Sequence, residues 1–102
     1  MLEHQGIRWG YVFLQAASHI GTEDIHDLMV QAVEMYLAGE EERKIERPGF
    51  EGRLFTERRY EIIGELGGQR FDVELETPYG RDKAAFLVSE RTAGIGSVIS
   101  RN

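Results

Sequence analysis

The chain has 102 residues, of which 41% are apolar and 29% are charged, and this size and composition are typical of one globular domain. It contains no cysteine, which excludes a disulfide framework, a thiolate metal site and a cysteine nucleophile. The net charge is −6; residues 1–51 carry ten acidic against four basic side chains, whereas residues 52–102 carry eight of each. An acidic first half repels nucleic acid and anionic membrane surfaces, because binding to both depends on Lys and Arg. We expect a single α+β domain over residues 1–102.

The start of the chain also bears on its location. The segment MLEHQGIRWG lacks the basic and apolar stretches of a signal peptide, and no apolar run is long enough to span a membrane. We therefore expect a cytoplasmic protein without membrane contact.

The first elements expected are a strand and a helix. Residues 6–18, GIRWGYVFLQAAS, are dense in β-branched and aromatic residues and predict a central strand buried on both sides. Gly21 breaks this strand, Thr22 is a candidate N-cap, and the acidic residues that follow favour a helix start. Apolar residues then recur every three or four positions, which predicts an amphipathic helix packed on a sheet. The helix ends at Gly39 or extends into the EEERK run beyond it.

Two segments follow the helix. Residues 40–52 combine a charge run with Pro48-Gly49 and show little periodicity, which indicates a connection on the surface. Residues 58–76, RRYEIIGELGGQRFDVELE, predict a hairpin that turns at Gly67-Gly68. In that register one face is charged and sets Glu61 opposite Glu74, and the other is apolar and covers the helix. The apolar face comprises Tyr60, Ile62, Phe71, Val73 and Leu75.

The end of the chain predicts a turn, a strand and a short tail. Residues 77–82, TPYGRD, form the turn, and the apolar run of residues 83–90 suits an inner strand. The stretch Ser97–Ser100 is expected to be an edge strand or part of an arm that reaches a partner. The expected fold is thus one amphipathic helix packed on a mostly antiparallel sheet of four to five strands. Its order is β-α-β-β-β, with a short C-terminal strand.

Few residues indicate catalysis or ligand binding. His19 and His26 lie near the acidic start of the helix, but their spacing matches no established metal-ligand pattern. The pair Glu61 and Glu74 would be solvated on an exposed face, where it has no reason to share a proton. The glycines of GELGGQRF connect strand to strand, whereas a phosphate loop leads from a strand into a helix. We expect no catalytic residue, no metal and no cofactor.

The second half of the chain offers an alternative function. Its basic residues are nearly all arginine, and Tyr60 and Tyr79 lie near them, as expected of a site that grips RNA and stacks a base. The run ERRYEIIGELGG, followed by a strand, a turn and FLVSERTA, resembles the C-terminal half of BrnT-type toxins, ribosome-dependent ribonucleases of the RelE/ParE superfamily. The resemblance covers residues 57–93. It implies that Arg59 and Arg91 contact RNA and that Glu61 or Glu65 acts as a base; Arg70 is a further RNA-contacting candidate.

The acidic residues of the first half favour a different function. Their concentration over residues 23–51 suits docking on a basic partner surface, because complementary fields speed association. We therefore predict a small protein-binding or inhibitory module, such as an immunity protein, an antitoxin or a phage-encoded inhibitor, with the ribonuclease toxin as the alternative. A homodimer built through the tail strand or the Trp9, Tyr11 and Phe13 face is a further expectation. The candidate docking residues are Glu23, Asp24, Asp27, Glu40, Glu41 and Glu42.

Overall fold

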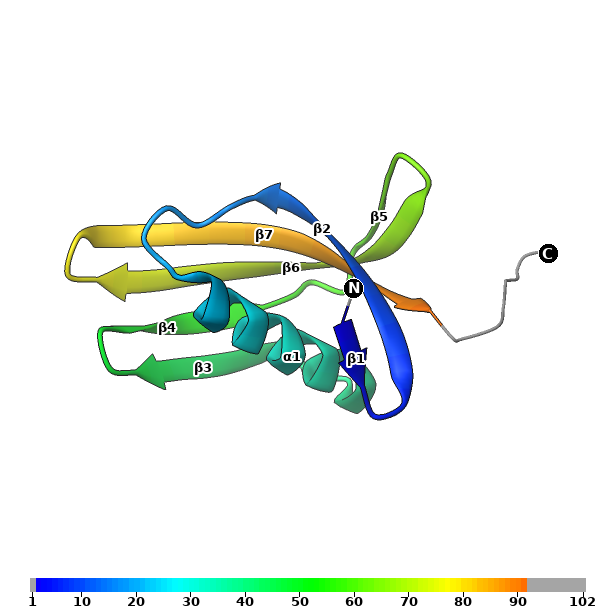
Figure 1. Ribbon diagram of the computed structural model, residues 1–102, viewed down its shortest axis with the longest axis horizontal. Coiled ribbons are helices and arrows are strands. Elements are labelled where there is room, and N and C mark those ends of the chain that lie inside the picture. The colour runs from blue at the N-terminus through cyan, green and yellow to red at the C-terminus, as the bar shows by residue number, and fades with distance from the viewer. Residues whose placement is uncertain (1, 92–102) are drawn as a thin grey trace.

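The computed structural model describes residues 2–91, which form one helix and seven strands (Figure 1). In chain order they are β1 (Leu2–His4), β2 (Ile7–Gln15), α1 (Thr22–Ala38), β3 (Glu42–Arg47), β4 (Phe50–Phe55), β5 (Tyr60–Ile63), β6 (Leu66–Thr77) and β7 (Gly80–Arg91). All strand pairs are antiparallel, in the order β1-β2-β7-β6-β4-β3, and β5 pairs with the start of β6. The sheet curls into a half-barrel around α1. The α+β class and the antiparallel sheet are confirmed, whereas the expected number and order of strands are wrong.

The core lies between α1 and the concave face of the sheet. Phe71 of β6 and Phe86 of β7 are opposite each other in register and stack with ring centroids 6.1 Å apart. Burying apolar side chains of this size contributes roughly 1.5–3 kcal/mol each, before conformational entropy is subtracted. The helix contributes the buried residues Leu28, Met29, Ala32, Val33 and Met35. No helix among the described residues is long and apolar enough to cross a membrane.

The two ends of α1 differ in how well the sequence predicted them. Of the two alternatives for its C-terminal end, the helix ends at Gly39, which has a left-handed conformation with φ of 74°, and the charge run beyond it does not extend α1. The N-cap prediction is wrong by one residue: Gly21 occupies the N-cap position, without a side-chain cap, and Thr22 is the first helical residue. The carbonyl of Gly21 accepts the first helical hydrogen bond, from the N–H of Ile25 at 3.0 Å.

Residues 40–52 do not form the expected surface connection. They contain most of the hairpin of β3 and β4, which turns at Pro48-Gly49 and pairs Ile45 with Gly52. Ile45 is the only buried residue of β3. Arg43 and Arg47 lie on the same face of the strand as Ile45, but they form ion pairs with α1 instead of joining the core. For this reason β3 lacks the alternation of apolar and polar residues that marks a half-buried strand.

The hairpin of β5 and β6 turns three residues earlier than predicted. Its turn is Gly64-Glu65, and the register pairs Ile63 with Leu66. Gly64 has a φ of 62°, in the left-handed region that glycine adopts without strain. Gly67 and Gly68 instead lie inside β6.

This shift of the turn changes which residues face each other. The predicted opposition of Glu61 and Glu74 is wrong, because Glu61 lies opposite Gly68. The apolar face is confirmed only in part: Phe71, Val73 and Leu75 are buried, whereas Tyr60 and Ile62 are 69% and 67% exposed. The exposed pair belongs to β5, a short strand at the margin of the sheet.

The predictions for residues 6–18 and 83–90 differ in how well the structure agrees with them. The predicted inner strand over residues 83–90 is confirmed, since it lies within β7, whose residues 84–88 are all buried. The prediction that residues 6–18 are buried on both sides is wrong, because Tyr11 and Phe13 are each 39% exposed. The predicted tail strand, Ser97–Ser100, lies outside the described residues.

Glu34 of α1 joins the two end strands of the half-barrel. Its carboxylate accepts a hydrogen bond from Arg43 of β3 at 2.9 Å and lies 3.6 Å from the Nε2 atom of His4 in β1. Arg43 also donates to Glu40 at 2.7 Å. The hydrogen bond that Arg43 donates to Glu34 outweighs the burial of Arg43 and, together with the bond and charge of Glu40, raises the pKa of its guanidinium. One helical carboxylate thus connects both margins of the sheet.

Changing Glu34→Gln is therefore expected to lower the free energy of unfolding by about 1 kcal/mol, since the hydrogen bond from Arg43 no longer has a charged acceptor. Urea denaturation measures this difference. Glu46→Gln is the matched control, because the ion pair of Glu46 within residues 2–91 is with the exposed Lys44, at 3.6 Å. We expect the control to change the free energy by less than about 0.5 kcal/mol. Equal losses in the two variants would contradict the linking role of Glu34.

Candidate functional site

The six acidic residues predicted to form a docking site lie in two groups, one at each end of α1. Glu23, Asp24 and Asp27 are in the first turns of α1, and Glu40, Glu41 and Glu42 follow its C-terminal end. A helix of 17 residues is about 25 Å long, so the two groups lie well apart. β3 runs beside the helix between them (Figure 1). We call these six residues the acidic surface.

Arginines of the neighbouring strands lie between the carboxylates of this region. Arg47 of β3 pairs with Asp24 at 3.4 Å and also donates to Asp27. Arg53 of β4 pairs in the same way with two carboxylates, Glu42 at 3.7 Å and Glu74 at 3.4 Å. Each guanidinium thus neutralises only half of the charge around it.

The remaining acidic residues show the same surplus. Arg43 lies between Glu34 and Glu40, and Arg58 pairs with Glu41 at 3.4 Å. Glu23 is exposed and forms no ion pair within residues 2–91. Negative charge therefore remains on the acidic surface after every described pair is counted.

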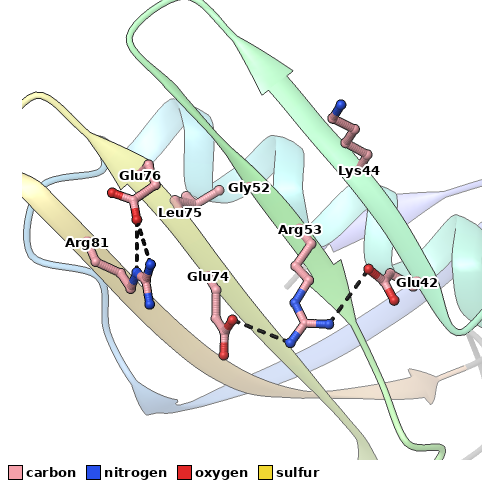
Figure 2. Close-up of a pocket in the computed structure, with 8 residues that line it drawn as sticks. All are labelled: Glu42, Lys44, Gly52, Arg53, Glu74, Leu75, Glu76 and Arg81. Carbon is pink, nitrogen blue, oxygen red and sulfur yellow. Dashed lines mark hydrogen bonds and ion pairs between the residues drawn. The ribbon is translucent and has the colours of Figure 1, made fainter.

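A hollow of about 370 Å³ lies on the face of the sheet that points away from the helix (Figure 2). Figure 2 shows Arg53 reaching toward carboxylates on both sides, and Arg81 pairing with Glu76 at 2.9 Å. These pairs form a ladder of charges across four strands, and the hollow contains no serine, threonine, histidine or tyrosine. The lining residues are Glu42, Lys44, Gly52, Arg53, Glu74, Leu75, Glu76 and Arg81. The lining thus consists mainly of paired charged side chains.

Two of the three candidate RNA-contacting residues are brought together. Arg59 and Arg70 both pair with Glu61, at 2.9 Å and 3.5 Å. Arg70 also donates to Asp72, and this hydrogen bond outweighs burial and raises the pKa of Arg70. The two positive charges are thus balanced by two carboxylates. The side chain of the third candidate, Arg91, lies outside the described part of the structure.

A second hollow, of about 310 Å³, lies at the C-terminal end of α1. Arg58 is part of its lining and has a φ of 58°, which is unusual for a residue with a side chain. Its guanidinium donates to the carbonyl of Gly39, and α1 has no basic residue in its own last turn. Arg58 therefore supplies the positive charge that stabilises this helix end. Sequence reasoning missed this role because the two residues are 19 positions apart.

Asp82 is a further residue that the sequence did not single out. Its side chain accepts hydrogen bonds from the backbone N–H groups of Ser18 at 3.1 Å and His19 at 2.7 Å, in the loop before α1. Burial acts to raise the pKa of this carboxyl, but hydrogen bonds from His19, Ser18 and Lys83 and the charge of His19 outweigh burial and lower it. The His19 ring also stacks on Tyr79, with centroids 5.3 Å apart. Asp82 thus holds the loop from which the helix starts.

No group of three or more His, Asp or Glu residues in the described structure is arranged to hold a metal ion. Comparison of the chain with protein-family models, with curated proteins and with solved structures gives no match. The resemblance to BrnT-type toxins therefore stays a prediction.

Proposed function

We propose that this protein is a non-enzymatic binding module of the inhibitory type, which docks through its acidic surface on a basic surface of a partner protein. The observation that carries the proposal is the surplus of carboxylates along α1 and β3. Arg43, Arg47 and Arg53 are each shared between two carboxylates. The field that remains is negative, so it attracts a basic partner and speeds association.

The internal ion pairs also support binding in a second way. A carboxylate held by one arginine still has free lone pairs that can accept hydrogen bonds from a partner's Lys or Arg. Because the side chain is already positioned, less conformational entropy is lost when the partner binds. Asp24 and Glu42, for example, are each held by an arginine of β3 or β4. The acidic surface is therefore charged and preorganised.

The proposal is tested by affinity capture of the tagged protein's partners from a host lysate, divided into nuclease-treated and untreated halves. We expect a basic protein that survives nuclease treatment and is released by salt, since the Debye length falls from about 10 Å at 0.1 M to about 3 Å at 1 M. The double variant Glu23→Lys with Glu41→Lys should weaken this binding at least about tenfold, which corresponds to about 1.4 kcal/mol. Both side chains are exposed, so their replacement leaves the core intact.

The matched control changes the same amount of charge elsewhere. Glu57→Lys with Glu65→Lys alters two exposed residues outside the acidic surface, and we expect it to bind like the unchanged protein. Equal weakening by both double variants, or binding that resists salt, would contradict the proposal. RNA or ribosomes retained only in the untreated half would instead favour the ribonuclease function, with Arg59→Ala as its next test.

A further inference from the structure

The sheet has a free edge along most of β2. β1 pairs only with the first part of this strand, from Ile7 to Trp9. From Gly10 to Gln15, β2 pairs with β7 on one side, and no described strand lies on the other. We call residues 10–15 the free edge of β2.

The free edge lacks two of the usual protections of exposed strand edges, although its register with β7 is irregular between Phe13 and Gln15. Its sequence, GYVFLQ, contains no charged residue and no proline, although natural proteins commonly place such residues on edges to prevent unwanted pairing. Tyr11 and Phe13 are each 39% exposed, and their rings contact each other edge to face at 6.1 Å. This segment is therefore suited to pairing with a further strand.

The strand at the other edge of the sheet, β3, is less suited to pairing with the same strand of a second copy. Antiparallel pairing about a two-fold axis places residues of the same face opposite each other. For β3, a register centred on Lys44 sets that lysine against its own copy and Glu42 against Glu46. A register centred on Ile45 sets Arg43 against Arg47 and Lys44 against Glu46. Like charges thus oppose self-pairing of β3 in the first register, and in the second the like pairs offset the opposite pairs.

The free edge of β2 meets no such opposition. A register centred on Val12 places Tyr11 opposite Phe13 of the second copy, and an aromatic cross-strand pair of this kind is favourable. A register centred on Phe13 places the two Phe13 rings opposite each other, just before the irregularity of β2 at Leu14. Neither arrangement brings like charges together.

We propose that two copies of this chain form a two-fold dimer, in which the free edge of β2 pairs antiparallel with the free edge of β2 in the second copy. The two sheets then join into one continuous sheet, with the half-barrels on either side of the axis. β3 lies at the far end of each sheet, so both acidic surfaces stay uncovered. The dimer does not depend on the proposed function, and it would present two docking surfaces to partners.

Light scattering of the full chain over a range of concentrations tests the dimer. We expect a mass twice the 11.6 kDa of one chain. Tyr11→Lys should shift the protein to the monomer, because it places a charged side chain on the uncharged pairing edge. Tyr79→Lys is the matched control: this tyrosine is 76% exposed, in the turn between β6 and β7, and its replacement should leave the dimer unchanged.

Disulfide cross-linking is a second test of the dimer, and it does not require the Tyr11→Lys variant to fold. The chain has no cysteine, so a single introduced cysteine can only bond to a second copy. Residues at the centre of an antiparallel register have Cβ atoms about 4.5–5.5 Å apart, close to the separation of about 3.5–4.5 Å in disulfides. In the register centred on Val12, Val12→Cys should therefore form a covalent dimer on oxidation. In the register centred on Phe13, Phe13→Cys should do so instead. Lys44→Cys, on the edge of β3, should not.

Two results would overturn the dimer. One is a monomeric mass at every concentration, whether the free edge of β2 is then left open or covered by another segment of the same chain. The other is cross-linking through Lys44→Cys but through neither β2 variant. Since these experiments change β2 and the docking test changes Glu23 and Glu41, either proposal can fail without the other.

Discussion

Replacing Gly52 with alanine is expected to lower the free energy of unfolding by about 3 kcal/mol, at the upper end of what overpacking usually causes. A Cβ atom on Gly52 would lie 1.9 Å from the carbonyl oxygen of Glu74 and 2.8 Å from the Cα atom of Leu75. Both contacts are to the backbone of β6, which cannot rotate away as a side chain can. β4 would have to separate from β6, and the β3–β4 hairpin would move with it. Urea or thermal denaturation measures the loss.

The sign of the change in the free energy of unfolding shows whether packing against β6 or the local strand propensity of residue 52 dominates. Considered as an isolated strand residue, glycine is less favourable than alanine by roughly 0.5–1 kcal/mol, so propensity alone predicts a gain in stability. Gly21→Ala serves as the control, because a Cβ atom there has no neighbour within 4 Å and its φ is −71°. Its cost as a lost N-cap glycine should be about 1 kcal/mol or less. Unchanged or increased stability of the Gly52 variant would contradict the close approach of β4 to β6.

Replacing Asp82 with asparagine is expected to lower the free energy of unfolding at pH 7 by about 2 kcal/mol, because buried charged hydrogen bonds are lost. Asp82 is 7% exposed, and its two carboxylate oxygens accept from the N–H groups of Ser18 and His19. An asparagine amide has only one acceptor oxygen, so its NH₂ group would face one of these donors. Asp27→Asn is the control, since Asp27 lies at the surface beside Arg47, and it should cost less than about 1 kcal/mol.

The contribution of Asp82 should also depend on pH. Because folding lowers the pKa of its carboxyl, the folded protein binds this proton less readily than the unfolded chain does. The stabilisation is therefore complete above the unfolded value of about 3.9, and it is lost as the pH falls through the folded value. Unfolding curves from pH 7 to pH 2 should show the difference between the unchanged protein and the Asp82 variant shrinking below about pH 4. A difference that is constant with pH would contradict the role of the ionised carboxylate.

The two proposed surfaces lie at opposite margins of the sheet. The free edge of β2 carries no charge, whereas five of the six residues of β3 are charged and two of them, Arg43 and Arg47, pair with α1. A dimer through β2 would therefore leave Glu40, Glu41 and Glu42 of each copy accessible. If both proposals hold, the gain from binding a divalent partner depends on whether that partner can span the two surfaces.

The sequence predicted the carboxylates of the acidic surface but not the arginines that pair with them. The excess of carboxylates over residues 23–51 could be read directly, since charge is a property of composition. The pairing of these carboxylates with Arg53 and Arg58 could not, because both arginines follow the turn of the β3–β4 hairpin, a hairpin that was not expected. Asp82 was missed for a related reason, since its partners Ser18 and His19 lie 64 and 63 positions away.

The sequence determined three features by itself through local chemistry: the α+β class, the amphipathic helix with Gly39 as one of two candidate ends, and the inner strand within β7. Each depends on periodicity or on the conformational freedom of glycine, and both are local properties. Tertiary structure alone decided that β3 is a strand, that the hairpin turns at Gly64, and that β2 has a free edge. These features depend on which distant strand or helix lies alongside: α1 supplies the carboxylates that allow arginines in β3, and β1 is too short to cover β2 beyond Trp9.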